Sequence, residues 1–257
     1  MNIYQHFRPE EREFIDQVLH WKNYVETQYT PKLTDFLDPR EQHILKLLIG
    51  ENGDVNYKLF GGSLDVERKR ALIIPDYLTV SAEEFQISLF EIHYPTKFVT
   101  IEHRQVLGTL MSLGLTRGKF GDILIKDSEI QFFAAKEVSD YIKSNLESIG
   151  RAGVKLVEVA HENALSAKES WEENEITVSS LRLDTVISGI HHLSRQKAQL
   201  HIQQGLVKVN WTLIENPSFE CGVGDMISIR GHGRAKIMGI DGKTKKEKWR
   251  INIGRQK

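Results

Sequence analysis

The chain has 257 residues, and 40% of them are hydrophobic, which is enough for packed cores and excludes a disordered tail. Its length predicts about two or three domains. A single cysteine, Cys221, excludes an internal disulfide framework and a cysteine-cluster metal site. No apolar stretch approaches the roughly 18–20 residues that cross a bilayer, and the first residues lack a signal-peptide pattern, so we expect a cytoplasmic protein without a membrane span.

The formal net charge of −1 conceals a strong asymmetry. Residues 1–175 carry 20 Lys and Arg against 29 Asp and Glu, whereas residues 176–257 carry 14 against 6. A basic segment of this kind predicts a module that binds anions, most often nucleic acid. A chance cluster of solvated charges is the alternative interpretation.

Residues 1–70 are predicted to form a helical N-terminal region. Apolar residues at spacings of three and four predict a first helix over residues 14–25. Asp38, Pro39 and Glu41 form a capping box, which predicts the start of a second helix. We interpret the apolar stripes of both helices as core.

Residues 71–160 change periodicity repeatedly, in the order strand, helix, strand, strand, helix, strand. Strands are predicted over residues 85–94, 123–126, 130–134 and 154–159, and helices over residues 106–111 and 138–149. This βαββαβ order is typical of ferredoxin-like domains, which include RNA-recognition (RRM-like) folds. Phe132 and Phe133 are candidates for base stacking, although alternation puts only one of them on each face and core packing is the alternative.

The loop over residues 114–122 combines three glycines with two cations, Arg117 and Lys119. Backbone N–H groups and positive charge in a short loop can bind phosphate, so both cations are candidates for a second RNA contact. The spacing excludes a P-loop, because no glycine lies five positions before Gly118 and no Ser or Thr follows Lys119. An ordinary structural loop is the alternative.

Residues 161–178 are rich in Glu, Ser and Asn and are predicted to be a linker to a domain over residues 179–257. In that domain one short helix is predicted after Ser180 and a second after Ser194, which is a natural N-cap. Gly205 can end the second helix in a left-handed conformation, and strands are predicted to follow.

This run resembles the RNA-binding domain named after small-subunit ribosomal protein S-four. The matching residues, in the order that the family has, are Arg182-Leu183-Asp184, Leu193-Ser194-Arg195, Ala198, Ile202, Gly205, Val207, Val209-Asn210, Gly224-Asp225 and Gly231. Trp211 departs from the family pattern, which has Gly there, and Gln199 stands where Arg is common. The resemblance implies an S-four-type αL fold that binds structured RNA.

Cations on this domain suit RNA phosphates, which Arg can bind through two hydrogen bonds. We expect the helices to bring Arg182, Arg195 and Lys197 together, the returning strands to add further cations, and Asp184 to orient Arg182. The candidate RNA-binding residues are Arg182, Ser194, Arg195, Lys197, Lys208, Asn210, Arg230, Arg234 and Lys236. A predicted C-terminal hairpin carries Lys243, Lys245 and Lys246, which form a second candidate RNA contact or a soluble edge.

As a whole, the chain resembles YlmH-type proteins, whose genes lie in bacterial division clusters. The resemblance implies an α+β protein of Gram-positive bacteria or cyanobacteria that is not an enzyme and has no cofactor or metal. It implies binding to ribosomal RNA or tRNA on the large ribosomal subunit, with protein partners at residues 1–160. Rescue of stalled subunits that carry peptidyl-tRNA is the specific hypothesis, because a small heat-shock relative with this domain binds them.

The alternative hypothesis is an RNA-modifying enzyme of the pseudouridine synthase type. Those enzymes carry a catalytic Asp in a Gly-Arg-Leu-Asp context, which Arg182-Leu183-Asp184 resembles. Here Leu181 precedes the triplet and Leu193-Ser194-Arg195 follows at the S-four spacing, which assigns Asp184 to the RNA-binding domain. We find no paired nucleophile and base in the sequence to support catalysis.

Overall fold

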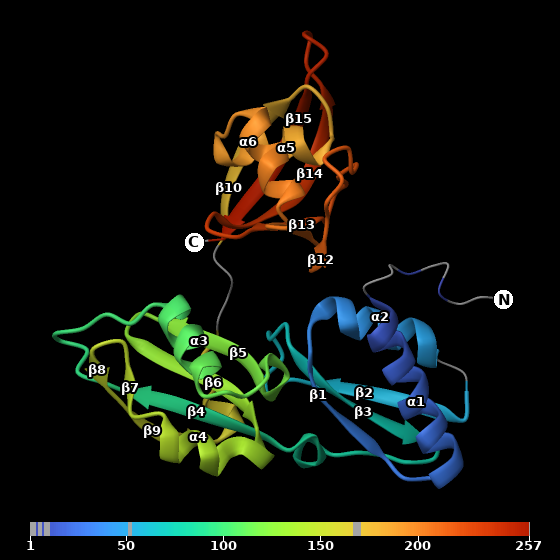
Figure 1. Cartoon of the computed structure of the whole chain (residues 1–257), viewed down its shortest axis with the longest axis vertical. Helices are drawn as coiled ribbons and strands as arrows, with labels where there is room; N and C mark the ends of the chain where they lie inside the picture. Colours follow the sequence, from blue (N-terminus) through green and yellow to red (C-terminus); the bar gives the residue numbers. More distant parts are fainter. Residues whose placement is uncertain (1–3, 5–6, 8–10, 51–52, 167–170, 257) are drawn as a thin grey trace. The chain divides into compact units, whose positions relative to one another are not determined.

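The computed structural model describes residues 4, 7, 11–50, 53–166 and 171–256. These residues form helices and antiparallel sheets, so the predicted α+β class is confirmed (Figure 1). The chain divides into two compact units, Met1–Ala167 and Lys168–Lys257. Within the described ranges, no helix has both the length and the apolar character needed to cross a membrane.

The first unit begins with an α/β layer rather than with helices alone. Its elements are α1 (Arg12–Gln28), β1 (Lys32–Leu37), α2 (Pro39–Ile49), β2 (Val55–Phe60) and β3 (Lys69–Pro75). Both predicted helices are present, and α2 has the predicted capping box, with the Asp38 carboxylate accepting from the Glu41 N–H. The prediction of a purely helical region is wrong, because three antiparallel strands in the order β1-β3-β2 lie in the same stretch. The central strand β3 is buried along nearly its whole length, so it lacks the alternation that marks a strand in a sequence.

The middle of the chain has the predicted ferredoxin-like order. Its main elements are β4 (Ile87–His93), α3 (His103–Ser112), β5 (Phe120–Lys126), β6 (Glu129–Ala135), α4 (Ser139–Asn145) and β9 (Lys155–Val159). A small hairpin, β7 (Ser148–Ile149) and β8 (Ala152–Gly153), precedes β9. The sheet order is β5-β6-β4-β9 with every pair antiparallel, which is the arrangement that the split βαβ pattern produces.

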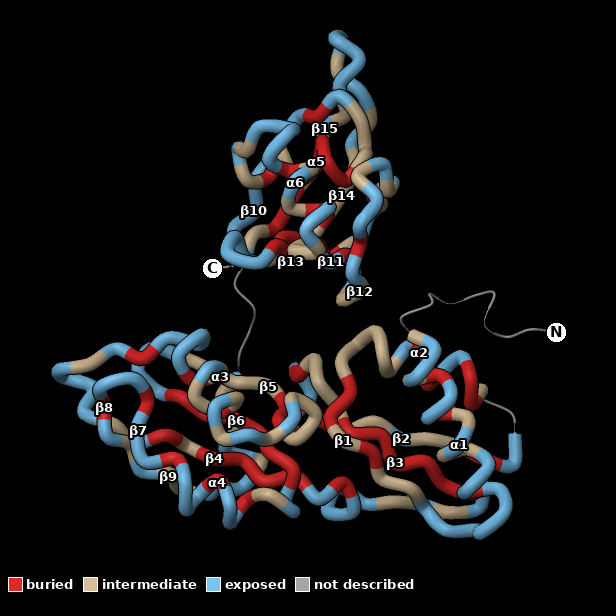
Figure 2. The backbone as a smooth tube through the Cα atoms, viewed as in Figure 1, coloured by how far each residue is buried: buried red, intermediate tan, exposed pale blue. Residues whose placement is uncertain are grey.

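Both faces of this middle sheet are covered. On one face Phe90 and Phe132 pack with residues of α3 and α4, and on the other Phe133 packs with Phe36 and Leu72 of the N-terminal layer. Figure 2 shows the strands β3, β4 and β6 as buried. Base stacking on Phe132 or Phe133 is therefore excluded in this conformation, because both side chains are fully buried.

The segment that follows β9 also packs on the sheet instead of forming a linker. A short 3-10 turn, His161–Asn163, is held there by Gln131, whose side-chain amide donates to the Asn163 carbonyl and accepts from the Leu165 N–H. The predicted linker is wrong here and over residues 171–178, which form a strand. Residues 167–170 of that prediction lie outside the described residues.

The second unit is a six-stranded antiparallel sheet with two helices on one face. Its elements are β10 (Trp171–Val178), α5 (Leu183–His191), α6 (Arg195–Gln203), β11 (Val207–Val209), β12 (Thr212–Leu213), β13 (Met226–Ile229), β14 (Gly233–Lys243) and β15 (Trp249–Gln256). The strand order is β10-β15-β14-β13-β11-β12, so the first strand of the unit pairs with the last. Strand β10 is polar because it is an edge strand with most of its side chains exposed, which is why its composition suggested a linker. The core lies between the sheet and the helices, around Val186, Ile202 and Ile227.

Candidate nucleic-acid interface

A buried carboxylate organises the basic surface at the two helices of the second unit. Asp184, in the first turn of α5, is 0% exposed and accepts hydrogen bonds from three long side chains. Arg182 donates from Nε and Nη2 at 3.2 Å each, Arg195 from Nε at 3.0 Å, and Gln199 from Nε2 at 2.8 Å. The sequence-based expectation that Asp184 orients Arg182 agrees with these contacts, and Arg195 is held in the same way.

The hydrogen bonds around Asp184 keep it ionised. Burial alone raises the pKa of this carboxyl group, but the hydrogen bonds from Arg182, Gln199 and Arg195 outweigh burial and hold the pKa well below its usual range. The arginine side chains are 39% and 53% exposed, so each guanidinium keeps donors available to a ligand. The arrangement fixes two planar cations, suited to phosphate, at the surface.

The start of α6 adds to this positive surface. Ser194 caps the helix, with its Oγ accepting from the Lys197 N–H at 3.2 Å, as the sequence predicts. Arg195 and Lys197 lie exposed in the first turn. Unpaired N–H groups and the helix dipole at such an N-terminus favour an anion. We name Arg182, Arg195 and Lys197 the helix-side cluster.

The strand cations lie on the other face of the sheet. Val207 and Val209 are buried against the helices, so Lys208 between them points away from the helices. Lys208 pairs with Ser228, which pairs with Arg234, so the three form a row across β11, β13 and β14. Lys236 follows Arg234 on the same face, and Arg230 is exposed in the β13–β14 turn. We expected the returning strands to add their cations to those of the helices. Because side chains alternate along a strand, Lys208, Arg234 and Lys236 instead lie on the face opposite the helices.

Asn210 has a structural role. Its side-chain amide donates to Asp225 Oδ1 at 2.8 Å and accepts from the Met226 N–H at 2.9 Å, which ties two turns together. Asn210 and Trp211 both have positive φ, 50° and 63°, and form the two-residue loop between β11 and β12. A loop of this kind needs positive φ at both positions, which explains why the family has Gly where this chain has Trp211. The amide thus has a structural role in the turn, and RNA contact by the exposed Asn210 stays a prediction.

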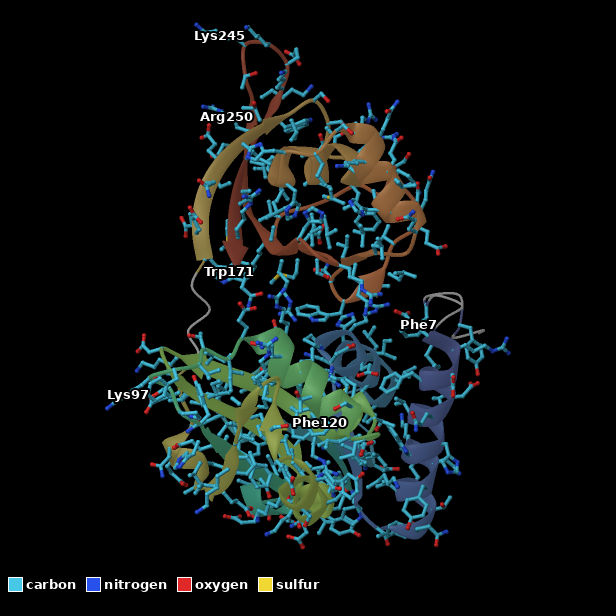
Figure 3. All side chains as sticks on the ribbon, turned by 60° about the vertical axis from the view of Figure 1, so that its left-hand side comes forward. Phe7, Lys97, Phe120, Trp171, Lys245 and Arg250 are labelled. Carbon is cyan, nitrogen blue, oxygen red and sulfur yellow. The ribbon has the colours of Figure 1, made fainter. Side chains whose placement is uncertain are left out.

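The lysine-rich hairpin projects as the sequence predicts. Figure 3 shows Lys245 at the tip of the β14–β15 hairpin and Arg250 on the following strand. Lys243 contacts Glu247 at 3.1 Å and lies 5.3 Å from the centroid of the Trp249 ring, so it is already engaged. Lys245 and Lys246 are exposed and remain candidates for RNA contact.

The glycine loop of the first unit uses its cations internally. Arg117 donates to the carbonyls of Phe120 and Gly121, and Lys119 contacts Asp35 at 2.6 Å and Glu137 at 3.1 Å. These contacts join β1 to the middle sheet. The structure therefore favours the structural-loop interpretation over the prediction of phosphate contact at Arg117 and Lys119.

The buried position of Asp184 also bears on the enzyme hypothesis. A catalytic carboxylate must contact the base that it modifies, whereas Asp184 is fully enclosed by its own partners. The hypothesis of a pseudouridine synthase therefore loses its candidate catalytic residue, Asp184. Sequence reasoning missed a different group, His201, His232 and Arg255, which the structure gathers around His191. No local signal connects these residues, because they come from separate elements.

Three known families match successive parts of the chain. "YlmH, N-terminal" matches residues 10–78, "Putative RNA-binding domain in YlmH" matches residues 81–163, and "S4 domain" matches residues 181–227. The last is the S-four domain, and its match covers both helices, β11, β12 and the first two residues of β13. The first two matches fall on the two successive sheets of the first unit, and the third falls on the second unit.

Individual proteins give the same result. The chain is 46% identical over 256 residues to the "Ribosome-associated protein quality control protein P2" of Bacillus subtilis (strain 168), covering 100% of this chain and 99% of that protein. It is 33% identical over 79 residues to "Small ribosomal subunit protein uS4" of Anaeromyxobacter sp. (strain Fw109-5), covering 30% and 38% of the two chains. A solved structure, "Cell division protein ylmH from Streptococcus pneumoniae", is similar with a TM-score of 0.55 and 34% identity, covering 64% of this chain and 100% of that one. Because the identity to the Bacillus subtilis protein extends over nearly the whole of both sequences, the chain belongs to the YlmH family of RNA-binding proteins with an S4 domain.

Proposed function

We propose that this protein binds ribosomal RNA or tRNA on the large ribosomal subunit and acts there in ribosome-associated quality control, in the cytoplasm. The observation that carries the proposal is the helix-side cluster, in which Asp184 holds Arg182 and Arg195 at the surface beside the N-terminus of α6. The name of the Bacillus subtilis relative supports the ribosomal role, and that of the Streptococcus pneumoniae protein supports a link to cell division. Rescue of stalled subunits that carry peptidyl-tRNA is the specific activity that we propose.

The geometry suits an RNA backbone for a physical reason. A long arginine side chain loses rotamer freedom when it binds a phosphate, and this loss weakens the contact. In this protein Asp184 has already ordered both arginines before RNA arrives, so less freedom is lost on binding. The exposed Lys208 and Arg230 and the half-buried Arg234 form a second basic region on the same unit. RNA recognition through backbone and shape would use both regions.

The first unit is the candidate surface for protein partners. Residues 1–160 belong to the acidic part of the chain, which opposes indiscriminate adhesion to RNA. The sheet face that RNA-recognition domains commonly use for stacking is covered here by the N-terminal layer and by the segment held by Gln131. Any RNA contact of the first unit would therefore use loops rather than this sheet face.

The first test of the proposal measures RNA binding by the full chain. The variant Arg195→Gln/Lys197→Gln removes two exposed cations and leaves Arg182 and Gln199 to hold Asp184. We expect the affinity for large-subunit RNA to fall about ten-fold or more and the log–log salt slope to become shallower by up to about 2. The matched control, Lys97→Gln/Lys155→Gln, removes the same charge from exposed positions of the first unit and should leave binding unchanged. Equal binding by the two variants would place the RNA on another surface.

The second test asks whether the protein binds ribosomes. Cell extract is fractionated on a sucrose gradient at low salt, and fractions are probed for the protein and for tRNA. We expect the protein in the large-subunit fractions, together with tRNA. Sedimentation only at the top of the gradient would refute the ribosomal part of the proposal and leave RNA binding to be judged by the first test.

A further inference from the structure

Three histidines from separate segments lie together at one end of the second unit. His191 is in the last turn of α5, His201 lies in α6, and His232 lies in the turn between β13 and β14. The His232 ring is 5.4 Å from the His191 ring and 5.3 Å from the His201 ring, centroid to centroid, with interplanar angles of 62° and 70°. His232 thus packs edge-on against both of the other rings.

Polar nitrogen atoms are buried without a partner at this cluster. Nε2 of His191, Nδ1 of His201 and Nε of Arg255 are each inaccessible to solvent and make no hydrogen bond within the described residues. Buried polar groups are nearly always hydrogen-bonded in folded proteins, so three such atoms in one region indicate a hydrogen-bond partner from outside the chain, and Arg255 Nε, which can only donate, needs an acceptor. A metal ion is a poor candidate, because the described part of the chain has no group of three ligating side chains suited to one.

The surrounding charges favour an anion. Burial, then Arg255, and then the rings of His232, His192 and His201 lower the pKa of His191 to about 4, so His191 is neutral near pH 7. The groups that face it therefore include a permanent cation from β15 and imidazoles from α5, α6 and the β13–β14 turn. The residue that pairs with Arg255 on the neighbouring strand β10 is Glu172, an acidic residue with an exposed side chain. An anion at this place would offset the charge of Arg255 and supply acceptors to the three nitrogens.

The turn that carries His232 allows access to these atoms. His232 is exposed and lies between Gly231 and Gly233, which both have positive φ, 86° and 87°. Glycines place few restrictions on the backbone, so this turn can move the ring aside. Arg230 begins the same turn and is exposed, so one cation of the proposed RNA surface lies two residues from His232.

We propose that Arg255, His191 and His201 form a binding site for a phosphate group of the RNA backbone, with the His232 ring as its cover. This inference rests on the proposed function. It adds a phosphate contact in the second unit, at residues outside the helix-side cluster. Phosphate oxygens accept hydrogen bonds from Arg255 Nε and from the imidazoles. Since binding of the anion favours protonated imidazole, the contact strengthens as the pH falls toward the pKa of His191, which burial and Arg255 lower to about 4.

The test uses inorganic phosphate as the probe and the full-length protein with labelled histidine rings. Titration with millimolar phosphate, against sodium chloride at matched ionic strength, should shift the imidazole NMR signals of His191 and His201 and raise the pKa of His191. Arg255→Met should abolish these shifts, whereas His232→Ala, which removes only the cover, should keep or strengthen them. The exposed His43 of α2 is the internal control and should not respond. Signals of His191 and His201 that respond no more than that of His43 would overturn the inference without any variant having to fold.

RNA binding separates this inference from the proposed function. We expect His201→Gln to weaken RNA binding by the full-length protein, because it removes one of the phosphate ligands, while the control His43→Gln leaves RNA binding unchanged. If His201→Gln binds RNA as tightly as the wild type while Arg195→Gln/Lys197→Gln loses affinity, the phosphate site is refuted and the proposed function stands. If phosphate moves the ring signals but Arg195→Gln/Lys197→Gln binds RNA normally, the site is supported and the helix-side proposal fails.

Discussion

The hydrogen bonds to Asp184 predict a specific loss of stability in Asp184→Asn. The substitution keeps the size of the side chain but removes its charge and replaces one acceptor oxygen by a donor NH2 group. The donors of Arg182, Arg195 and Gln199 would then face a neutral amide that can accept fewer bonds. Both arginines would also lose the group that orders them for RNA.

The size of the effect follows from the burial of the partners. Removing one partner of a fully buried ion pair costs about 3–5 kcal/mol, whereas exposed pairs contribute less than about 1 kcal/mol. Asp184 is 0% exposed, but its partners Arg182 and Arg195 are 39% and 53% exposed and can be rehydrated. We therefore expect Asp184→Asn to lower the free energy of unfolding of the second unit by about 2–3 kcal/mol.

The pH dependence of this difference has a definite sign. The pKa of Asp184 in the folded protein lies well below its value of about 3.9 in an unfolded chain. A carboxyl group with a lowered folded pKa contributes its full stabilisation above the unfolded pKa and loses it as the pH falls toward the folded pKa. The difference between wild type and Asp184→Asn should be constant from about pH 5 to 8 and should shrink below about pH 4.

Urea unfolding measures this difference. In a Trp21→Phe background the fluorescence comes from Trp171, Trp211 and Trp249, which all lie in the second unit. The control Glu175→Gln, at an exposed position of the edge strand β10, should change stability by less than about 0.5 kcal/mol. Equal urea midpoints for Asp184→Asn and Glu175→Gln would refute the stabilising role assigned to the buried carboxylate.

Three further substitutions test other parts of the structure. Arg70→Met should destabilise the first unit by about 2–4 kcal/mol in urea unfolding followed by Trp21, because Arg70 is 4% exposed and bonded to two carbonyls and Glu137; an unchanged midpoint would contradict this. Phe133→Ala should cost about 3–5 kcal/mol through the cavity it leaves, while RNA affinity, measured by filter binding, stays unchanged; a loss of affinity in a folded variant would restore the stacking hypothesis. Lys245→Ala/Lys246→Ala should weaken RNA binding to all sequences alike and reduce the salt slope by up to about 2, with an unchanged slope counting against RNA contact at the hairpin tip.

Local features of the fold were predictable from short stretches of sequence. The capping box at Asp38, the N-cap at Ser194 and the left-handed Gly205 after α6 all form as expected, because each depends on residues within one turn of the chain. The two-residue loop Asp127-Ser128 joins β5 to β6, which agrees with the strands predicted on either side of it. The strands β1 and β3 escaped prediction because they pair across a long stretch of chain, and burial of β3 removes its alternation.

The residue types of the candidate site could be predicted from the sequence, but their arrangement in space could be predicted only in part. Arg182 and Arg195 lie together because both donate to Asp184, and Lys197 follows Arg195 in the first turn of α6. Lys208 and Arg234 lie on the other face because side chains of a strand alternate and the core takes their neighbours. Lys119 was a plausible phosphate ligand by type, yet its partners Asp35 and Glu137 come from distant elements.

The amino-acid sequence by itself determined the family, the order of the parts and the concentration of positive charge after residue 175, because these properties depend on residue types and spacing. Tertiary structure decided which charges remain available to RNA. Asp184 is buried among three donors, Lys119 is paired within the first unit, and the histidines meet around His232. Most of these contacts join residues from separate helices and strands, which only the folded chain brings together.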